Sequence, residues 1–191
     1  MKPPSRLLRQ LFGIDLRTLA LFRATLGAVL AVDIGQRLGD AAAFYSDAGV
    51  LPRSWLAQFG DHWRVSAYLA SGQTWFAVLL LTLQGLAALA LFFGWRTRPA
   101  AVLAFVLEAS LLNRNELVLT QGDTLLVCLL FWSLFLPLGA RWSVDASLGS
   151  RPPPQEPQHL SWASAALLLQ VVSVYFFNAL MKSGPVWWPE G

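Results

Sequence analysis

The sequence contains few charged residues and few side chains of the kinds that bind metals. Only 13% of its 191 residues are charged, whereas an ordinary soluble domain carries about 25%. Its single cysteine, Cys128, has no partner for an internal disulfide. The two histidines, His62 and His159, lie far apart in sequence with no Cys/His cluster around them. The sequence therefore predicts no zinc site and no metal cofactor.

Basic clusters and repeats are missing as well. The formal net charge of +3 is small and spread along the chain, and no basic block with interleaved aromatic residues is present. Nucleic acid is therefore not an expected partner. No internal repeat or pair of interrupted apolar segments is visible, which argues against a transporter.

Apolar residues dominate what is present. They make up 55% of the chain and include nine tryptophans and twelve phenylalanines, more than the core of a soluble domain of this size would hold. A membrane-spanning helix needs about 17–25 residues, so the third and fourth of the apolar segments are short. We expect an all-α, polytopic helical membrane bundle with about five transmembrane segments. The five lie roughly at Thr18–Ile34, Trp75–Phe93, Pro99–Leu112, Leu125–Leu138 and Trp162–Met181.

The basic residues of the loops predict the orientation. With a cytoplasmic N-terminus, eight lysines and arginines fall on the inner side and five on the outer side. The positive-inside rule then places the N-terminus in the cytoplasm and the C-terminus outside. We expect a multi-pass protein of the cell membrane, with the lipid bilayer as its first partner.

The first outer loop, Gly35–Thr74, has a helical pattern of its own. Trp55, Phe59 and Trp63 lie four residues apart, on one face of a helix, and the charged residues fall elsewhere. This spacing predicts an amphipathic helix in the first outer loop. Such a helix lies either at the bilayer interface or against the outer end of the bundle.

Three charged residues interrupt the apolar segments. Arg23, Asp33 and Glu108 each lie within one, and such groups usually face the bundle interior or a water-filled cavity. Arg23 and Asp33 are ten residues apart, about 15 Å along a helix, so they cannot pair with each other. Two interpretations stay open for each residue: a structural bond to a neighbouring helix, or a part in a functional site.

Lys182 ends the last apolar segment, just before Gly184-Pro185 and the paired tryptophans Trp187 and Trp188. One interpretation is an interfacial anchor, because lysines at helix ends extend their ammonium group to the head groups. The other is a partly buried lysine that loses its proton easily and acts as a general base.

Three stretches of the sequence resemble a known family. They are "FYSDAGVLPRSWL", "NRNELVLTQGDTLLVCLLFWSLFLPLGARWSVDASL" and "YFFNALMKSGPVWWPEG". Together they resemble the vitamin K-dependent gamma-carboxylases and, more closely, their bacterial membrane relatives, the horizontally transferred transmembrane domain (HTTM) proteins. The resemblance extends from about Leu16 to Gly191. It predicts one HTTM-like membrane domain over residues 1–191, incomplete at its C-terminus.

The resemblance implies quinol chemistry at Lys182. In the carboxylases a membrane lysine at this place is the base that deprotonates a reduced naphthoquinone, whose oxidation by oxygen to an epoxide drives carboxylation of a glutamate. For this chain it implies a candidate base, Lys182, in an outward-facing pocket for a quinol or another lipid. The candidate pocket residues are Arg114, Asn115, Asp33, Glu108, Tyr175 and Trp187.

The chain also departs from the carboxylase pattern. Those enzymes have a histidine near the position of Asn115, whereas the loop here reads "NRNEL". They also continue into a large extracytoplasmic part, whereas this sequence stops at Gly191. The alternative hypothesis is therefore a non-catalytic membrane scaffold, or a subunit that needs a missing C-terminal part. The sequence predicts no particular protein partner.

Overall fold

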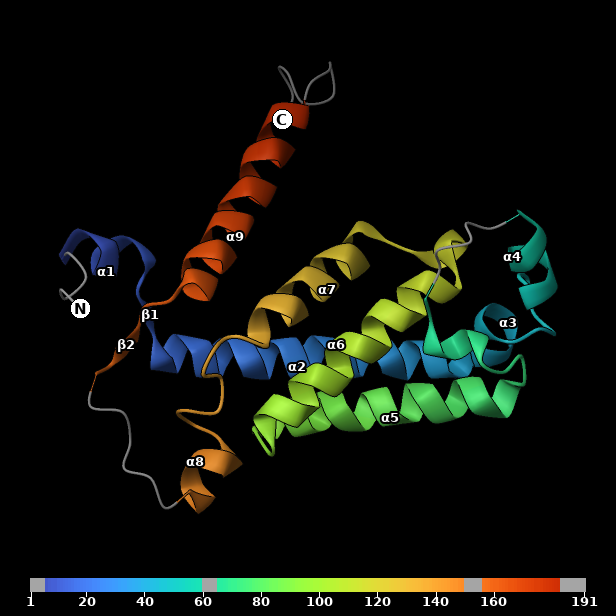
Figure 1. The fold of residues 1–191 in the computed structure, drawn as a ribbon, viewed down its shortest axis with the longest axis horizontal. Helices are drawn as coiled ribbons and strands as arrows, with labels where there is room; N and C mark the ends of the chain where they lie inside the picture. Colours follow the sequence, from blue (N-terminus) through green and yellow to red (C-terminus); the bar gives the residue numbers. More distant parts are fainter. Residues whose placement is uncertain (1–5, 60–64, 150–155, 183–191) are drawn as a thin grey trace.

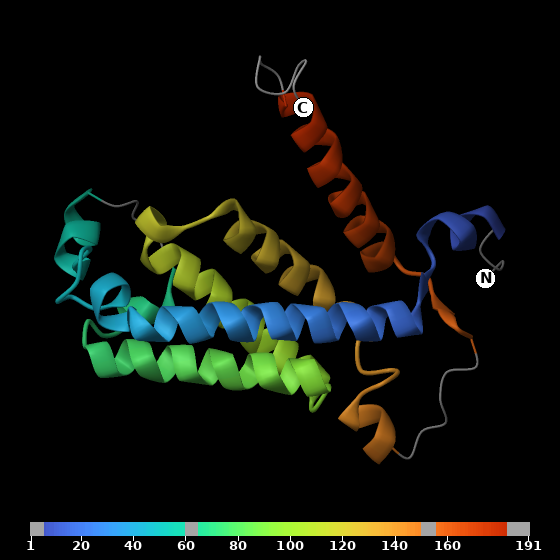
Figure 2. The same ribbon diagram turned by 180° about the vertical axis from the view of Figure 1, so that it is seen from behind.

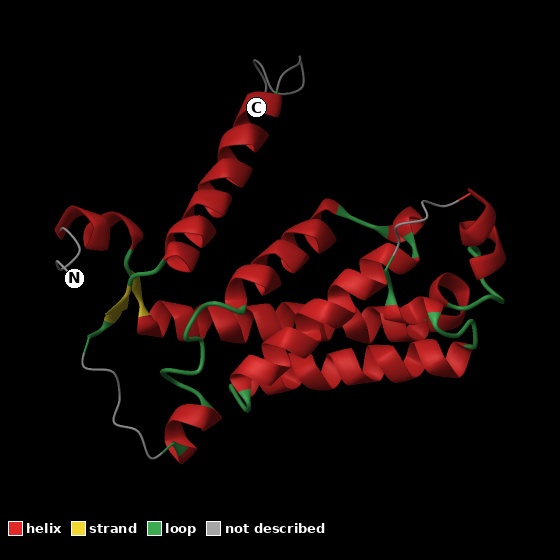
Figure 3. Ribbon diagram, viewed as in Figure 1, coloured by secondary structure: helices red, strands yellow, loops and turns green. Residues whose placement is uncertain are grey.

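A computed structural model of the chain describes residues 6–59, 65–149 and 156–182. Regular structure in these ranges is almost entirely helical, apart from one two-stranded ribbon (Figure 3). The predicted all-α class is therefore confirmed.

Four helices form the body of the molecule. They are α2 (Leu16–Gly39), α5 (Thr74–Phe93), α6 (Thr97–Arg114) and α7 (Gln121–Ser133). Helix α2 packs against α5 and α7, and α6 packs against α5 and α7 (Figures 1 and 2). Consecutive helices run in opposite directions, so the connections of the bundle alternate between its two ends.

Three helices are long and apolar enough to cross a membrane: α2, α5 and α9 (Trp162–Met181). Helices α5 and α9 agree with the predicted segments to within one residue. The other two predicted spans correspond to α6 and α7, which are helical but do not meet the same measure of length and hydropathy. The five-span topology therefore stays a prediction.

The fourth apolar segment differs most from its predicted bounds. The expected range was Leu125–Leu138, but α7 begins at Gln121 and ends at Ser133. Thr120 starts the helix early, because its hydroxyl oxygen accepts the Asp123 N–H while the Asp123 carboxylate accepts the Thr120 N–H, a capping box. Pro137 disfavours helical backbone just before it, so the apolar residues after Ser133 form turns.

Short elements connect the long helices. Strands β1 (Ile14–Asp15) and β2 (Gln158–His159) pair antiparallel, with Ile14 opposite His159, and bring the start of α2 close to the start of α9. The remaining elements are α1 (Arg6–Phe12), α3 (Ala41–Tyr45), α4 (Arg53–Phe59), η1 (Ala67–Leu69), η2 (Glu116–Val118) and α8 (Val144–Leu148).

Helix α4 lies where the amphipathic helix was predicted. It carries Trp55, which is 58% exposed. Residues 60–64, and Trp63 among them, lie outside the described residues, so the amphipathic face stays a prediction.

Helices α2 and α5 approach each other closely at Gly27. A Cβ atom at this position would lie 2.6 Å from the Phe92 backbone nitrogen and 2.8 Å from the Ala88 carbonyl oxygen. Small residues allow helix backbones to approach in this way. Leu30, Leu81 and other buried apolar side chains fill the rest of the contact.

Arg23 is buried and binds three backbone carbonyls. Its Nη1 donates to the carbonyl oxygens of Leu91 and Phe92 at 2.8 and 2.9 Å, and its Nη2 donates to that of Trp142 at 2.7 Å. The last carbonyls of a helix have no partner within the helix. Arg23 therefore caps the end of α5, where Gly94 turns the chain with φ +71°. These contacts favour the structural interpretation of this intramembrane charge.

Helix α9 leaves the bundle. Its buried residues are Ala163, Ser164 and Leu167, all in the first two turns. From there the helix points away from α2, α5, α6 and α7, and its C-terminal half is exposed (Figures 1 and 2).

Candidate functional site

Lys182 is the C-cap residue of α9. Its backbone N–H donates to the Asn178 carbonyl oxygen at 3.2 Å, and its side chain is exposed. Tyr175 lies on the same stretch and is 75% exposed. The end of α9 points away from the four packed helices (Figure 1), so the structure does not bring Lys182 together with Asp33 or Glu108. Trp187, the remaining candidate of this region, lies outside the described residues.

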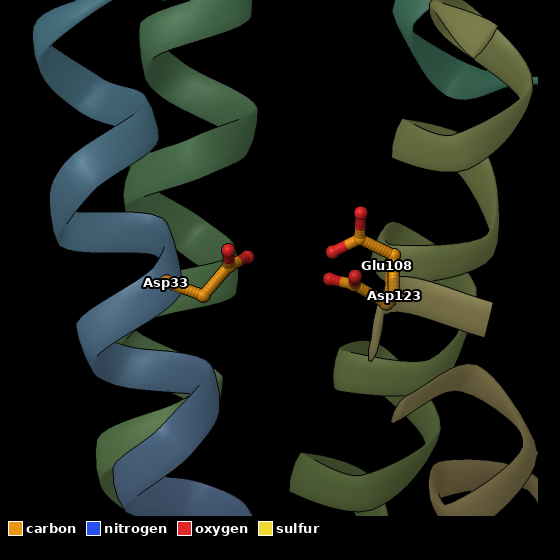
Figure 4. A group of neighbouring side chains, drawn as sticks. All are labelled: Asp33, Glu108 and Asp123. Carbon is orange, nitrogen blue, oxygen red and sulfur yellow. The ribbon is translucent and has the colours of Figure 1, made fainter. Parts of the chain in front are cut away.

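A cluster of acidic side chains lies between α2, α6 and α7 instead. Asp33 comes from α2, Glu108 from α6 and Asp123 from the first turn of α7. One carboxylate oxygen of each residue lies within 4.8 Å of the other two. In Figure 4, Glu108 and Asp123 lie side by side and Asp33 faces them. We call these three residues the carboxylate cluster.

Arg37 links two members of the carboxylate cluster. Its Nε donates to Asp33 Oδ2 at 2.7 Å and its Nη2 to Asp123 Oδ1 at 2.5 Å. Its Nη1 donates to the Tyr45 hydroxyl oxygen at 2.8 Å. Burial raises the pKa of the Tyr45 phenol, so Tyr45 stays neutral. The guanidinium therefore neutralises one carboxylate charge and fixes the position of two carboxylates.

Glu108 is the most enclosed member of the cluster and has no exposed surface. Its Oε2 accepts a hydrogen bond from Gln84 Nε2 on α5. The oxygen of the same amide, Gln84 Oε1, accepts a long hydrogen bond from the Tyr68 hydroxyl at 3.5 Å. Glu108 Oε1 is buried and accepts no hydrogen bond within the part of the chain that the structure describes. A buried polar atom without a partner is rare and requires an explanation.

An open groove on the surface of α2 borders the cluster at Asp33. It has a volume of about 380 Å³ and is lined by Ala28, Val29, Val32, Asp33 and Gln36. The Asp33 side chain is 25% exposed. Asp33 thus connects the buried acids with the outer face of the bundle.

Arg114 and Asn115 are neighbours at the C-terminal end of α6. Both are fully buried. Arg114 donates to the carbonyl oxygens of Leu51 and Ser46 at 2.8 and 3.2 Å. Asn115 Nδ2 donates to the Phe44 carbonyl oxygen at 2.9 Å. These contacts hold the first loop against the end of α6, and a role in binding a lipid stays a prediction.

Three polar residues of this region were not predicted. Arg37 and Asp123 stood in segments read as loops, and Gln84 was one uncharged residue in an apolar run. Two local signals were available: Arg37 follows Asp33 by four residues on the same helix, and Asp123 completes a capping box with Thr120.

The first loop is also held by Asp47, which gives a pH-dependent prediction. Asp47 pairs with Arg53 at 2.8 Å and lies 3.8 Å from Arg114. Its hydrogen bond with Arg53 lowers the pKa of the Asp47 carboxyl. This ion pair therefore stabilises the loop above the usual aspartate pKa, and the stabilisation is lost as the pH falls through the lowered one.

We expect Asp47→Asn to speed amide hydrogen exchange in residues 46–53 at neutral pH. The cost is at most about 1 kcal/mol, because both partners are partly exposed. Acidification of the unsubstituted protein through this lowered pKa, below the usual aspartate value of about 3.9, should reproduce the effect, and the variant should no longer respond there. Asp40→Asn, a change on the preceding turn, serves as the control. Equal exchange rates in all three proteins at neutral pH would contradict the prediction.

Comparison with known proteins identifies the family. A family model, the HTTM domain, matches residues 13–191. No curated protein and no solved structure matches the chain. The matched region includes the whole bundle, the carboxylate cluster and α9. Together with the apolar helices, this match makes the chain a membrane protein. It confirms the family that the loop motifs predicted: the chain belongs to the HTTM domain family.

Proposed function

We propose that the chain is a multi-pass domain of the cell membrane that acts on a reduced naphthoquinone or a similar lipid, with Lys182 as the base. The observation that carries the proposal is the place of Lys182 at the end of the 20-residue apolar helix α9, in a chain of the HTTM family. The proposed topology has a cytoplasmic N-terminus and an extracytoplasmic C-terminus, since the loop charges favour it.

The surface beside Lys182 suits an apolar ring. Tyr175, Phe176 and Phe177 are all more than half exposed on the last turns of α9. When bound, a reduced naphthoquinone would supply an acidic hydroxyl and the electrons for reaction with oxygen. As the base, Lys182 Nζ would accept the hydroxyl proton. The apolar side chains would keep water from the ring.

The second candidate function is a non-catalytic membrane scaffold or subunit. Arg114 and Asn115, two expected pocket residues, bind backbone carbonyls of the first loop, which is a structural role. The exposed apolar residues of α9 would then contact lipid or a partner helix.

An epoxidation assay separates the two functions. Membranes that contain the chain receive a reduced naphthoquinone and oxygen, and quinol loss and epoxide formation are followed. We expect epoxide from the unsubstituted chain and a loss of at least about 100-fold in Lys182→Ala, the usual contribution of a general base.

Lys182→Arg is the matched variant. Arginine keeps the positive charge and the interfacial anchor but stays protonated, so it cannot act as a base. Loss of epoxide in both variants supports the base. Epoxide formation restored by arginine, or absent from all three inserted proteins, would leave Lys182 as an anchor and favour the scaffold.

A further inference from the structure

We propose that Glu108 binds a proton in the centre of the bundle and that Asp33 connects this proton with the groove on α2. The ligand is the proton itself, carried on a carboxyl group. The inference does not depend on quinol chemistry or on Lys182, and it concerns a separate part of the molecule.

The charges around Glu108 do not balance without a proton. Three carboxylates face one guanidinium, that of Arg37. The other polar groups that face the cluster, Gln84 from α5, Tyr45 from α3 and Tyr68 from η1, are uncharged. With every acid ionised the cluster has a net charge of −2. A proton on Glu108 halves this excess negative charge in a place that water does not reach.

The hydrogen bonds indicate which acid carries the proton. Asp123 is satisfied at both oxygens: Oδ1 accepts from Arg37 Nη2, and Oδ2 accepts from the Thr120 N–H at 2.7 Å and from Thr120 Oγ1 at 3.1 Å. Asp33 Oδ2 accepts from Arg37 Nε. Each of these acids is stabilised as a carboxylate by a cation.

Glu108 differs on each of these points. Within the described residues Glu108 forms no ion pair, and its one hydrogen bond comes from the neutral amide of Gln84. Its second oxygen, Oε1, is fully buried and accepts nothing from the described residues. Burial without a counter-charge favours the neutral form of a carboxyl group. Glu108 Oε1 is therefore the atom that would hold the proton.

Asp33 provides a route by which the proton can leave Glu108. Its carboxylate lies within the 4.8 Å cluster and also lines the open groove, where it is 25% exposed. On release, the proton would leave Glu108 Oε1 for the Asp33 carboxylate, which reaches the groove on α2. No covalent bond between heavy atoms changes, and Arg37 keeps Asp33 oriented during the transfer.

Infrared spectroscopy of the full chain in lipid vesicles tests the site. We expect a C=O band of a protonated carboxyl group at neutral pH that shifts in ²H₂O. Labelling with ¹³C-glutamate should shift this band, and labelling with ¹³C-aspartate should not. This labelling needs no substitution and does not depend on how a variant folds.

Two variants and one control then test whether the band belongs to Glu108 and whether the proton leaves through Asp33. Glu108→Gln should abolish the band, whereas Glu116→Gln on the neighbouring turn η2 should keep it. Asp33→Asn should keep the band but slow its response to ²H₂O severalfold. A band that no glutamate label shifts, or that survives Glu108→Gln, would overturn the proposal.

The same carboxylates would also suit a divalent cation, so the spectra are recorded with Mg²⁺ and with a chelator. A Glu108 band that appears only after chelation would show that a cation and not a proton occupies the site, and this would overturn the proposal. A band that is the same in both conditions supports it.

Discussion

Replacement of Arg37 with methionine is expected to lower the free energy of unfolding by about 3–5 kcal/mol, because it removes the guanidinium that pairs with both Asp33 and Asp123. Asp33 and Asp123 would face each other and Glu108 with no guanidinium between them. Methionine keeps an unbranched apolar stem but removes the guanidinium, so the effect includes the lost charge and hydrogen bonds. Unfolding of the purified chain in detergent or lipid measures it.

The same substitution at an exposed ion pair is the control. Arg9 pairs with Glu156 at 2.7 Å, and the two side chains are 39% and 64% exposed. Arg9→Met should therefore cost less than about 1 kcal/mol. In the Arg37→Met background, Asp123→Asn should restore part of the loss, because it removes one of the unpaired charges. Equal stability of the Arg37→Met and Arg9→Met variants would show that the cluster is not held by Arg37.

The sequence predicts the helices well where hydropathy alone determines them. Helices α5 and α9 follow uninterrupted apolar runs, and their bounds agree with the structure. The predicted range of α7 lay four to five residues too far toward the C-terminus. The start of the helix depends on the capping box of Thr120 and its end on Pro137. Hydropathy does not report local hydrogen bonds or proline geometry, so the bounds of the more polar helices were less accurate.

The site was partly predictable. Asp33 and Glu108 were identified because ionisable residues inside apolar segments are costly and need a partner. Arg37 follows Asp33 by four residues on α2, so this spacing could have indicated the pair. The contacts with Asp123 and Gln84 could not be identified, since these residues come from α7 and α5. Their convergence depends on how α2, α5, α6 and α7 pack.

The hydrogen-bond partners of Arg114 and Asn115 could not be predicted from the sequence either. Both are polar residues at the predicted outer end of the bundle, which is where a pocket was expected. The structure shows that backbone carbonyls of residues 44–51 accept their hydrogen bonds. A sequence pattern identifies the side chains that donate hydrogen bonds, but not the loop whose carbonyl oxygens accept them.

The close contact between α2 and α5 at Gly27 gives the second large prediction. Gly27→Leu should lower the free energy of unfolding by about 1–3 kcal/mol or more, because a side chain there would have to enter occupied space. Its Cβ would meet backbone atoms of α5, namely the Phe92 nitrogen at 2.6 Å and the Ala88 carbonyl oxygen at 2.8 Å. Backbone cannot rotate away as a side chain can, so α2 and α5 would have to separate. That separation would also lengthen the hydrogen bonds of Arg23, which lies one turn earlier on α2, to the end of α5.

Gly35→Leu on the same helix is the matched control. Nothing lies within 4 Å of the Cβ position there, and leucine has a better helix propensity than glycine by up to about 1 kcal/mol. The two substitutions are chemically identical and should change stability in opposite directions. This difference in sign, measured by unfolding in lipid, isolates the contact between α2 and α5 from any general effect of leucine on a membrane helix. A Gly27→Leu variant as stable as Gly35→Leu would mean that the two backbones do not meet at this point.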